Sequence, residues 1–223
     1  MMIIKRKIID CDYRPGQSLN EASLASELGL TRMPLRDALR QLEFEGFVCI
    51  RPKKGVTIAK AEAEDIYQIT EATIMAATHA ISHYSHLIDR SFMADLHRRM
   101  SEIWFLDITA EDVDAEDFMR RIYDFCFELY DHLASITANR EIQSFFRATL
   151  DTRRRFINML EPICTANYFY NYFHTPNDTL DVALALAEGR FKDAIEYMDQ
   201  TLRAESYCQL MVWITANNNQ TDH

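Results

Sequence analysis

The pattern of apolar and polar positions along the chain changes near residue 60. Before that point, three short stretches have apolar residues at helical spacing. They are followed by the segments FVCI and VTIA, in which apolar and polar residues alternate. Alternation with a period of two is typical of a strand, and the basic RPKKG between the segments predicts a tight turn. Helix, helix, turn, helix and hairpin is the order of a winged helix-turn-helix, which we predict for residues 1–60.

Capping residues mark the helix ends in this region. Asn20 is a favourable N-cap for the helix EASLASEL, and Gly29 follows it where a left-handed C-terminal cap is needed. Pro34 falls in the first turn of the next helix, where its missing N–H breaks no hydrogen bond. Either Thr31 or Met33 caps that helix. Its predicted apolar stripe consists of Leu35, Ala38, Leu39 and Leu42.

Beyond residue 60 the pattern is helical to the end of the chain. Helical spacing of apolar residues, such as Phe118, Ile122, Phe125 and Leu129, is typical of bundle-facing edges. We therefore expect a mainly α protein, in which a winged helix-turn-helix with a small β-hairpin wing precedes an all-α helical bundle at residues 61–223. The predicted bundle helices are 62–86, 90–106, 113–136, 139–160, 177–188 and 190–214.

Charge divides at the same point. Residues 1–60 hold 11 Lys/Arg and 7 Asp/Glu, a net of +4, whereas residues 61–223 hold 13 and 27, a net of −14. A basic module for a polyanion joined to an acidic module would give this asymmetry. An excess of four can also arise by chance, so charge alone does not decide the partner.

Composition excludes several classes of protein. The five cysteines are odd in number and form no C-x-x-C pair, which is typical of reduced thiols in a cytoplasmic protein. No run of eighteen apolar residues and no signal-peptide pattern is present, so we expect a cytoplasmic protein without a membrane span. No Ser-His-Asp, P-loop or paired-carboxylate arrangement supports catalysis, and we expect no enzyme.

The candidate chemistry begins with three arginines in LTRMPLRDALRQL. Arg32, Arg36 and Arg40 are four residues apart and so share one helical edge. In a helix-turn-helix the second helix enters the major groove with its N-terminal residues leading, where arginine binds guanine or phosphate. Thr31 is a further phosphate donor, and Arg40, one turn deeper, is suited to the DNA backbone. The alternative is a solvated helix edge.

The tip of the predicted hairpin adds a second basic element. Gly55 permits the turn, and Lys53 and Lys54 are suited to the minor groove or its flanking phosphates. A basic helix edge followed by a basic hairpin predicts binding to double-stranded DNA. The predicted DNA-binding residues are Thr31, Arg32, Pro34, Arg36, Arg40, Lys53, Lys54 and Gly55.

The run YRPGQSLNEASLASELGLTRMPLRDALRQLEFEGFVCIRPKKGVTIA resembles the winged helix of GntR-type bacterial transcription regulators. The matching features are PG-x-x-L-x-E-x-x-L-A-x-x-L-G, then [ST]-R-x-P-[VL]-R-x-A-L-x-x-L-x-x-E-G, then the basic wing. The resemblance implies that Arg32, Arg36 and the tip 53–55 contact DNA.

The helical remainder resembles the FadR-like subfamily of these regulators, whose effector domain is an all-α bundle called the FCD domain. The segments TANREI and ALALAEGRFKDAIEYM provide this resemblance. It implies a homodimer formed by the bundles, which places two winged helices on a palindromic operator.

Many members of that subfamily hold a divalent metal between an Asp or Asn and three His. The corresponding positions here are Cys126, Tyr130, Thr179 and Thr201. None of them is His or Asp, which is a poor match to an imidazole-rich site. We therefore expect no cofactor and no subfamily metal. A slip of one helical turn would instead bring in the nearby Asp124, Asp131 and His132.

A separate candidate metal site is the series His79, His83 and His86. Spacings of four and three place these residues on one face of the helix predicted at 62–86, where they could bind zinc or nickel. This series supports the alternative function of a metal-dependent sensor or helical metal-binding protein. The other interpretation is a polar helix face or part of a dimer contact.

Arg153 lies on the inward stripe of its predicted helix, between Leu150 and Ile157. A buried arginine needs a partner, because an unpaired buried charge is costly. One interpretation is an anchor for the carboxylate or phosphate of a small effector, with Cys126, Tyr130, Thr179 and Thr201 lining the same site. The others are an ion pair with a neighbouring helix or, because TRRR at 152–155 makes the rotation ambiguous, exposure.

The aromatic segment NYFYNYF, residues 167–173, is a candidate lid, dimer patch or ordinary packing segment. Taken together, the sequence predicts a homodimeric, DNA-binding transcription regulator, in the role of repressor, whose DNA affinity responds to a small-molecule effector. A winged helix used for protein contact is a further alternative.

Overall fold

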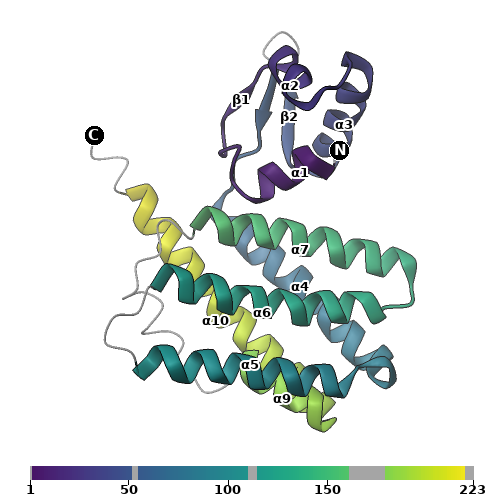
Figure 1. Ribbon diagram of the computed structural model, residues 1–223, viewed down its shortest axis with the longest axis vertical. Coiled ribbons are helices and arrows are strands. Elements are labelled where there is room, and N and C mark those ends of the chain that lie inside the picture. The colour runs from purple at the N-terminus through teal and green to yellow at the C-terminus, as the bar shows by residue number, and fades with distance from the viewer. Residues whose placement is uncertain (1, 52–54, 110–114, 161–178, 219–223) are drawn as a thin grey trace. The chain divides into compact units, whose positions relative to one another are not determined.

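The computed structural model describes residues 2–51, 55–109, 115–160 and 179–218, so the segment 167–173 lies outside the described residues. The fold is mainly α with one small sheet, as predicted (Figure 1). Two compact units are present, one formed by Met1–Glu62 with Arg154–Met159 and the other by Ala63–Arg153 with Leu160–His223. Each unit is described below on its own.

The first unit is a winged helix. Its elements in chain order are α1 (Met2–Ile9), β1 (Ser18–Leu19), α2 (Glu21–Leu28), α3 (Arg32–Phe44), β2 (Val48–Arg51) and β3 (Gly55–Ile58). The three strands form an antiparallel sheet in the order β1-β3-β2. The hairpin of β2 and β3 was predicted, whereas β1 was not, because two residues are too few to give an alternating pattern.

One apolar core holds this unit together. The predicted stripe of α3 is buried, with Leu35, Leu39 and Leu42 at most 1 % exposed, and the same cluster contains residues of α1 and of the sheet. On the hairpin, Val56 and Ile58 face the core. The helical and alternating periods of the sequence therefore identify the core faces of α3 and β3.

Local hydrogen bonds fix the ends of α2 and α3. The side chain of Asn20 accepts hydrogen bonds from the N–H groups of Ala22 and Ser23, and Gly29 has a left-handed φ of 63°. Both predicted caps of α2 are therefore confirmed. Thr31, and not Met33, is the N-cap of α3, but its side chain forms no capping hydrogen bond.

The second unit is a helical bundle. Its elements are α4 (Ala63–Tyr84), a short 3-10 helix η1 (Ser85–Leu87), α5 (Arg90–Thr109), α6 (Ala115–Ile136), α7 (Arg140–Leu160), α9 (Thr179–Glu188) and α10 (Phe191–Asn218). All six predicted helices are present. Helix α4 stops at Tyr84, where the prediction continued to residue 86, whereas α5 and α10 extend to Thr109 and Asn218, beyond the predicted ends at 106 and 214.

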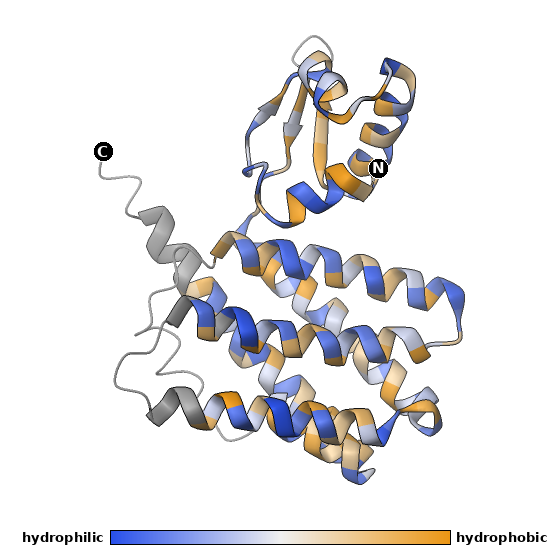
Figure 2. Cartoon of the chain, viewed as in Figure 1, coloured by the Kyte–Doolittle hydropathy of each residue, from blue (hydrophilic) through white to orange (hydrophobic). Residues whose placement is uncertain are grey.

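Helix α10 packs against both α4 and α9, and α5 packs against α9 and α6. Along each helix, apolar residues alternate with polar ones at helical spacing (Figure 2). Small buried residues of α4, Ala76, Ala77 and Ala80, allow a close approach of neighbouring helices. None of the described helices has the length and apolarity needed to cross a membrane.

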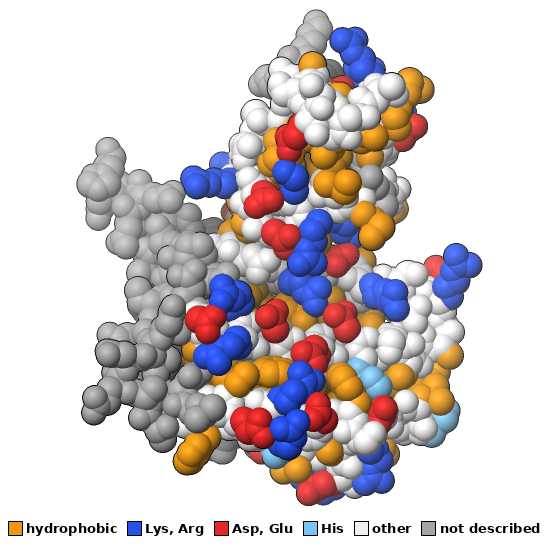
Figure 3. All heavy atoms as spheres, viewed as in Figure 1, with side chains coloured by type: hydrophobic (Ala, Val, Ile, Leu, Met, Phe, Trp, Pro, Cys, Tyr) orange, Lys and Arg blue, Asp and Glu red, His pale blue; other side chains and the backbone are white. Residues whose placement is uncertain are grey.

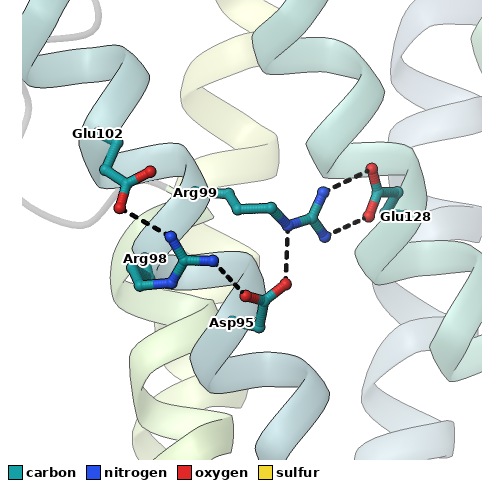
Figure 4. A network of polar contacts seen from close by, with 5 residues as sticks. All are labelled: Asp95, Arg98, Arg99, Glu102 and Glu128. Carbon is teal, nitrogen blue, oxygen red and sulfur yellow. Dashed lines mark hydrogen bonds and ion pairs between the residues drawn. The ribbon is translucent and has the colours of Figure 1, made fainter.

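The outer surface of the bundle is crossed by ion pairs. Arg99 on α5 bonds both Asp95 and Glu128, and so ties α5 to α6, while Arg98 bonds Asp95 and Glu102 (Figure 4). Basic and acidic side chains are mixed over the face that carries α5 and α6 (Figure 3). Exposed pairs of this kind each stabilise a fold by about 0–1 kcal/mol.

Candidate DNA-binding and effector sites

The predicted arginine edge of α3 faces solvent. Because Leu35, Leu39 and Leu42 turn toward the core, the side chains on the other face must point outward. Arg32, Arg36 and Arg40 are all exposed. Thr31 and Pro34 are exposed as well, so the leading end of α3 is open to a ligand.

The guanidinium groups of this edge differ in their partners. Arg36 Nε lies 3.1 Å from Glu21 Oε2 at the start of α2, although 62 % of the Arg36 side chain remains exposed. Such an exposed pair is weak and easily exchanged for a phosphate. Neither Arg32 nor Arg40 forms an ion pair within the described ranges. A positive ridge therefore remains on α3, and Glu21 is a member of the site that sequence reasoning missed.

The first turn of α3 adds backbone donors to the ridge. Leu35 N–H bonds the carbonyl of Thr31, which is the first hydrogen bond of the helix. By helix geometry the N–H groups of Arg32 and Met33 precede this bond and have no intrahelical acceptor, and Pro34 has no N–H. Amides at a helix N-terminus, in the positive field of the helix dipole, are suited to a phosphate.

The wing is attached firmly to α3. Glu43 Oε1 of α3 accepts a 2.7 Å hydrogen bond from the N–H of Ile50 in β2. Since β2 is an edge strand, this N–H would otherwise have no partner in the sheet. Gly55 opens β3 opposite the exposed Arg51 and has a φ of +82°, which favours glycine. Lys53 and Lys54 lie outside the described residues.

In the bundle, Arg153 is buried and paired. Its Nη2 donates to Glu205 Oε2 at 2.5 Å, which joins α7 to α10, and the two side chains are only 3 % and 11 % exposed. Gln209 Nε2 donates to the other carboxylate oxygen at 2.8 Å. Of the three interpretations of Arg153, exposure is wrong and the ion pair with a neighbouring helix is present.

Other predicted effector residues lie in the same unit. The Tyr130 ring centroid is 5.9 Å from Arg153 Cζ. Cys126 Sγ lies 3.3 Å from Thr179 Oγ1, within hydrogen-bonding distance. Thr201 is half-buried on α10, one turn before Glu205. The structure thus brings together Tyr130 with Arg153 and Cys126 with Thr179.

Burial controls the ionisation of this cluster. It raises the pKa of the Tyr130 hydroxyl well above its usual range, so that the group stays protonated. Burial also raises the pKa of Glu205, and the Arg153 charge opposes this effect. For Arg153, burial is the largest single influence and lowers the pKa, but Glu205, Tyr130, Tyr123 and Cys126 together raise it above its ordinary value, so the guanidinium stays charged.

Sequence reasoning missed Glu205. On α10 it is seven residues after Met198, three after Leu202 and four before Gln209, all of which are buried. A carboxylate at this spacing within an apolar stripe is the signal that could have identified it as the partner of Arg153.

The prediction that three histidines share one face of a helix is wrong for His86. Because α4 ends at Tyr84, His86 lies in η1 and leaves the helical spacing that His79 and His83 keep. The rings of His79 and His83 stack with centroids 4.2 Å apart, and His83 Nδ1 donates to the carbonyl of His79. Burial and then the neighbouring His83 lower the pKa of His79. Within the described ranges, no three His, Cys, Asp or Glu residues are grouped so as to hold a metal ion.

Comparison with known proteins shows which family the winged helix matches. Residues 2–58 match the family model of bacterial regulatory proteins, gntR family. An uncharacterised HTH-type transcriptional regulator of Agrobacterium vitis is 34 % identical over 84 residues, which cover 38 % of this chain and 48 % of that protein. The Nta operon transcriptional regulator of Aminobacter aminovorans is 39 % identical over 59 residues, covering 26 % of this chain and 28 % of that protein. The matched stretch thus spans less than half of these curated relatives.

Solved structures share the fold over nearly the whole chain. A crystal structure from Rhodococcus sp. RHA1, described as a GntR transcriptional regulator, covers 94 % of both chains with a TM-score of 0.66 at 20 % identity. McbR/YncC of E. coli covers 95 % of both chains with a TM-score of 0.65 at 13 % identity. At these identities the likeness concerns the fold alone. Residues 2–58 therefore form a winged helix that matches the gntR family of bacterial regulatory proteins, and the whole chain shares its fold with a solved structure described as a GntR transcriptional regulator.

Proposed function

We propose that this protein is a sequence-specific DNA-binding transcription regulator, acting as a repressor, whose DNA affinity is controlled by a small molecule bound in the helical bundle. The observation that carries the proposal is the exposed arginine edge at the leading end of α3. In a helix-turn-helix this end enters the major groove, and the wing follows the neighbouring backbone.

The proposed DNA-binding residues have two roles, contact with base edges and contact with phosphates. Arg32 and Arg36 are placed to reach base edges, where one guanidinium donates two hydrogen bonds to guanine O6 and N7. Thr31, the free amides of the first turn and Arg40 bind phosphates, which position the helix without reading sequence. Two copies of the chain on a palindrome double this interface, and the bundle is the proposed dimer contact.

Control by the effector follows from linkage. A ligand that favours one arrangement of the bundle helices shifts the population of that arrangement, and with it the DNA affinity. The coupling is typically about 1–3 kcal/mol. The candidate ligand site is the cluster around Arg153, which holds a charged group and neutral hydrogen-bonding groups inside an apolar bundle.

The test for DNA binding is a fluorescence-anisotropy titration of the full chain against DNA from its own upstream region and against scrambled DNA. A preference for a short palindrome and a steep loss of affinity with salt are expected. The double variant Arg32→Ala/Arg40→Ala should lose affinity, whereas the matched pair Arg98→Ala/Arg203→Ala on the bundle should retain it. Equal affinity for scrambled DNA would contradict a specific regulator.

The test for the effector is a thermal-shift screen against organic acids, sugar acids and acyl compounds, followed by the DNA titration with each hit. A compound that raises Tm and also changes operator affinity supports control through the bundle. If every stabilising compound leaves DNA affinity unchanged, the regulatory part of the proposal is wrong and DNA binding stands alone.

A further inference from the structure

Helix α3 carries an exposed apolar side chain at the end that leads into the DNA. Met33 is the second residue of the helix, directly after Arg32, and is 70 % exposed. The other exposed large apolar residues described in the winged-helix unit are Met2, Ile3 and Phe44. Of these four, Met33 is the one that lies in the first turn of α3.

The position of Met33 on the helix points it away from the core. The buried stripe of α3 consists of Leu35, Ala38, Leu39 and Leu42. At about 3.6 residues per turn, Met33 lies opposite the middle of that stripe, and Arg32 and Arg36 both lie to one side of it. Met33 is therefore nearer to the centre of the exposed face than either arginine.

This part of the face is unsuited to the phosphate backbone. A methionine side chain has no hydrogen-bond donor, so it contributes nothing to phosphate binding. Asp37, one turn after Met33, is exposed as well, and its carboxylate repels phosphate. In a helix-turn-helix the N-terminal residues of the second helix reach base edges in the major groove. Base edges, and not phosphates, are therefore the surface that Met33 would meet.

One base presents an apolar group in the major groove. Thymine has a C5-methyl group there, whereas the other bases present hydrogen-bond donors and acceptors. The methionine side chain is unbranched, flexible and polarisable, so it adapts to an apolar neighbour of irregular shape. Met33 is exposed to water in the free protein and gains a hydrophobic contact on DNA when a thymine methyl group lies beneath it.

We propose that Met33 determines a preference for thymine in each half of the operator, through contact of its side chain with the thymine C5-methyl group. This inference rests on the proposed DNA-binding function and names a base that one residue of α3 selects. Arg32 and Arg36 remain the residues that bind guanine. Each operator half therefore contains a guanine and a thymine that α3 reads by different chemistry.

The experiment begins with selection of bound sequences from a random pool of double-stranded DNA. The full chain and its Met33→Ala variant are used in parallel, and the bound DNA is sequenced. The unaltered protein should select a palindrome with thymine at a fixed position of each half. The variant should select the same palindrome with that position open to all four base pairs. The same thymine preference in both proteins overturns the inference.

A change in the DNA alone then tests the methyl group. Deoxyuridine keeps the hydrogen-bonding groups of thymidine and lacks the C5-methyl group. In fluorescence anisotropy, the unaltered protein should bind about fourfold more weakly for each selected thymine replaced, which is the contribution of a single buried methyl group. Met33→Ala should bind both duplexes equally. Equal binding by the unaltered protein overturns the inference, and this measurement does not depend on how any variant folds.

Phe44→Ala is the matched control. Phe44 lies on the same exposed face and is 87 % exposed, but it is the last residue of α3. Since the N-terminal part of the helix leads into the groove, this variant should keep the full loss caused by deoxyuridine. Met33→Leu retains an apolar side chain and should keep most of the thymine preference. Loss of the preference in Phe44→Ala but not in Met33→Ala overturns the inference.

Failure of this inference differs from failure of the proposed function. A selected palindrome that is bound equally with thymidine and with deoxyuridine leaves a sequence-specific regulator and removes only the role of Met33. If the unaltered protein selects no sequence from the pool, the proposed function is wrong and the inference falls with it.

Discussion

The arginines of α3 and those of the bundle occupy opposite electrostatic settings. On α3, Arg32 and Arg40 face solvent without a carboxylate partner in the described ranges. On the bundle, ion pairs with Asp or Glu engage Arg98, Arg99, Arg120, Arg121, Arg190 and Arg203. Of these six, Arg99 links α5 to α6 and the other five pair with residues two to four positions away in the sequence. Arg32 and Arg40, which have no such partner among the described residues, stay available to a polyanion.

Of the arginine pairs compared here, the Arg153–Glu205 pair of the bundle is the buried one. Exposed pairs are screened by water and contribute little, whereas removing one partner of a buried pair leaves an uncompensated charge. The contrast therefore predicts three outcomes of arginine substitution. Replacing Arg153 should lower the stability of the fold strongly, replacing the arginines of α3 should lower DNA affinity alone, and replacing the paired arginines on the bundle surface should have little effect on either.

The largest effect is expected at the buried pair. Arg153→Met should destabilise the protein by about 3–5 kcal/mol, because Glu205 is left charged without a partner. The double variant Arg153→Met/Glu205→Leu should recover most of this loss. Urea unfolding followed by circular dichroism measures both. A single variant as stable as the original protein would show that the pair is not a buried ion pair in solution.

The next effect is expected on DNA affinity. Arg32→Ala should weaken operator binding by about 1–3 kcal/mol, or about 5- to 150-fold, because one arginine at a base edge contributes that much. Arg36→Ala should cost less, because Arg36 gives up its pair with Glu21 when it binds DNA. Anisotropy titrations rank the two, with Arg98→Ala as the control. The reverse ranking would mean that Glu21 does not compete for Arg36.

A smaller effect is expected at the α2 cap. Asn20→Ala should lower the free energy of unfolding by about 1 kcal/mol, because the N–H groups of Ala22 and Ser23 lose their acceptor. Chemical denaturation at neutral pH measures this change. Asn20→Asp keeps an acceptor and should cost much less. A loss of equal size in both variants would assign the effect to something other than capping.

The smallest effect is a pH dependence at the start of α5. The side-chain hydroxyl of Ser91 and the N–H of Phe92 lower the pKa of Asp89, against a weaker opposing effect of burial. Since the folded pKa is depressed, this carboxylate stabilises the fold above its ordinary value of 3.8 and loses that contribution as pH falls through the folded pKa. Asp89→Asn should flatten stability against pH there. An unchanged acid limb of the curve would contradict this.

Local sequence patterns identified some features of the fold and missed others. The apolar stripe of α3 and the caps Asn20 and Gly29 depend on neighbours a few residues away, and sequence identified them. Strand β1 depends on pairing with β3, some forty residues later in the chain, and no local pattern marks it. The end of α4 before His86 was also missed, because the sequence there has neither Gly nor Pro.

The candidate sites show the same limit. The basic edge was predictable because it is one face of one helix. The partners Glu21 and Glu205 were not, since each comes from a different helix than the arginine it binds. A helical period places a residue on a face but does not say which residue of another element meets it. The DNA and effector roles of these residues stay predictions.

The hydrogen bond from the Ile50 N–H to Glu43 links two parts of the winged helix. It joins β2 of the wing to the helix that carries the arginines, which restricts the movement of one against the other. In the proposed homodimer, each winged helix would then present its wing and its arginines to one half of the operator in a restricted relative position. Tolerance for a longer or shorter spacer between the halves would have to come from elsewhere in the chain.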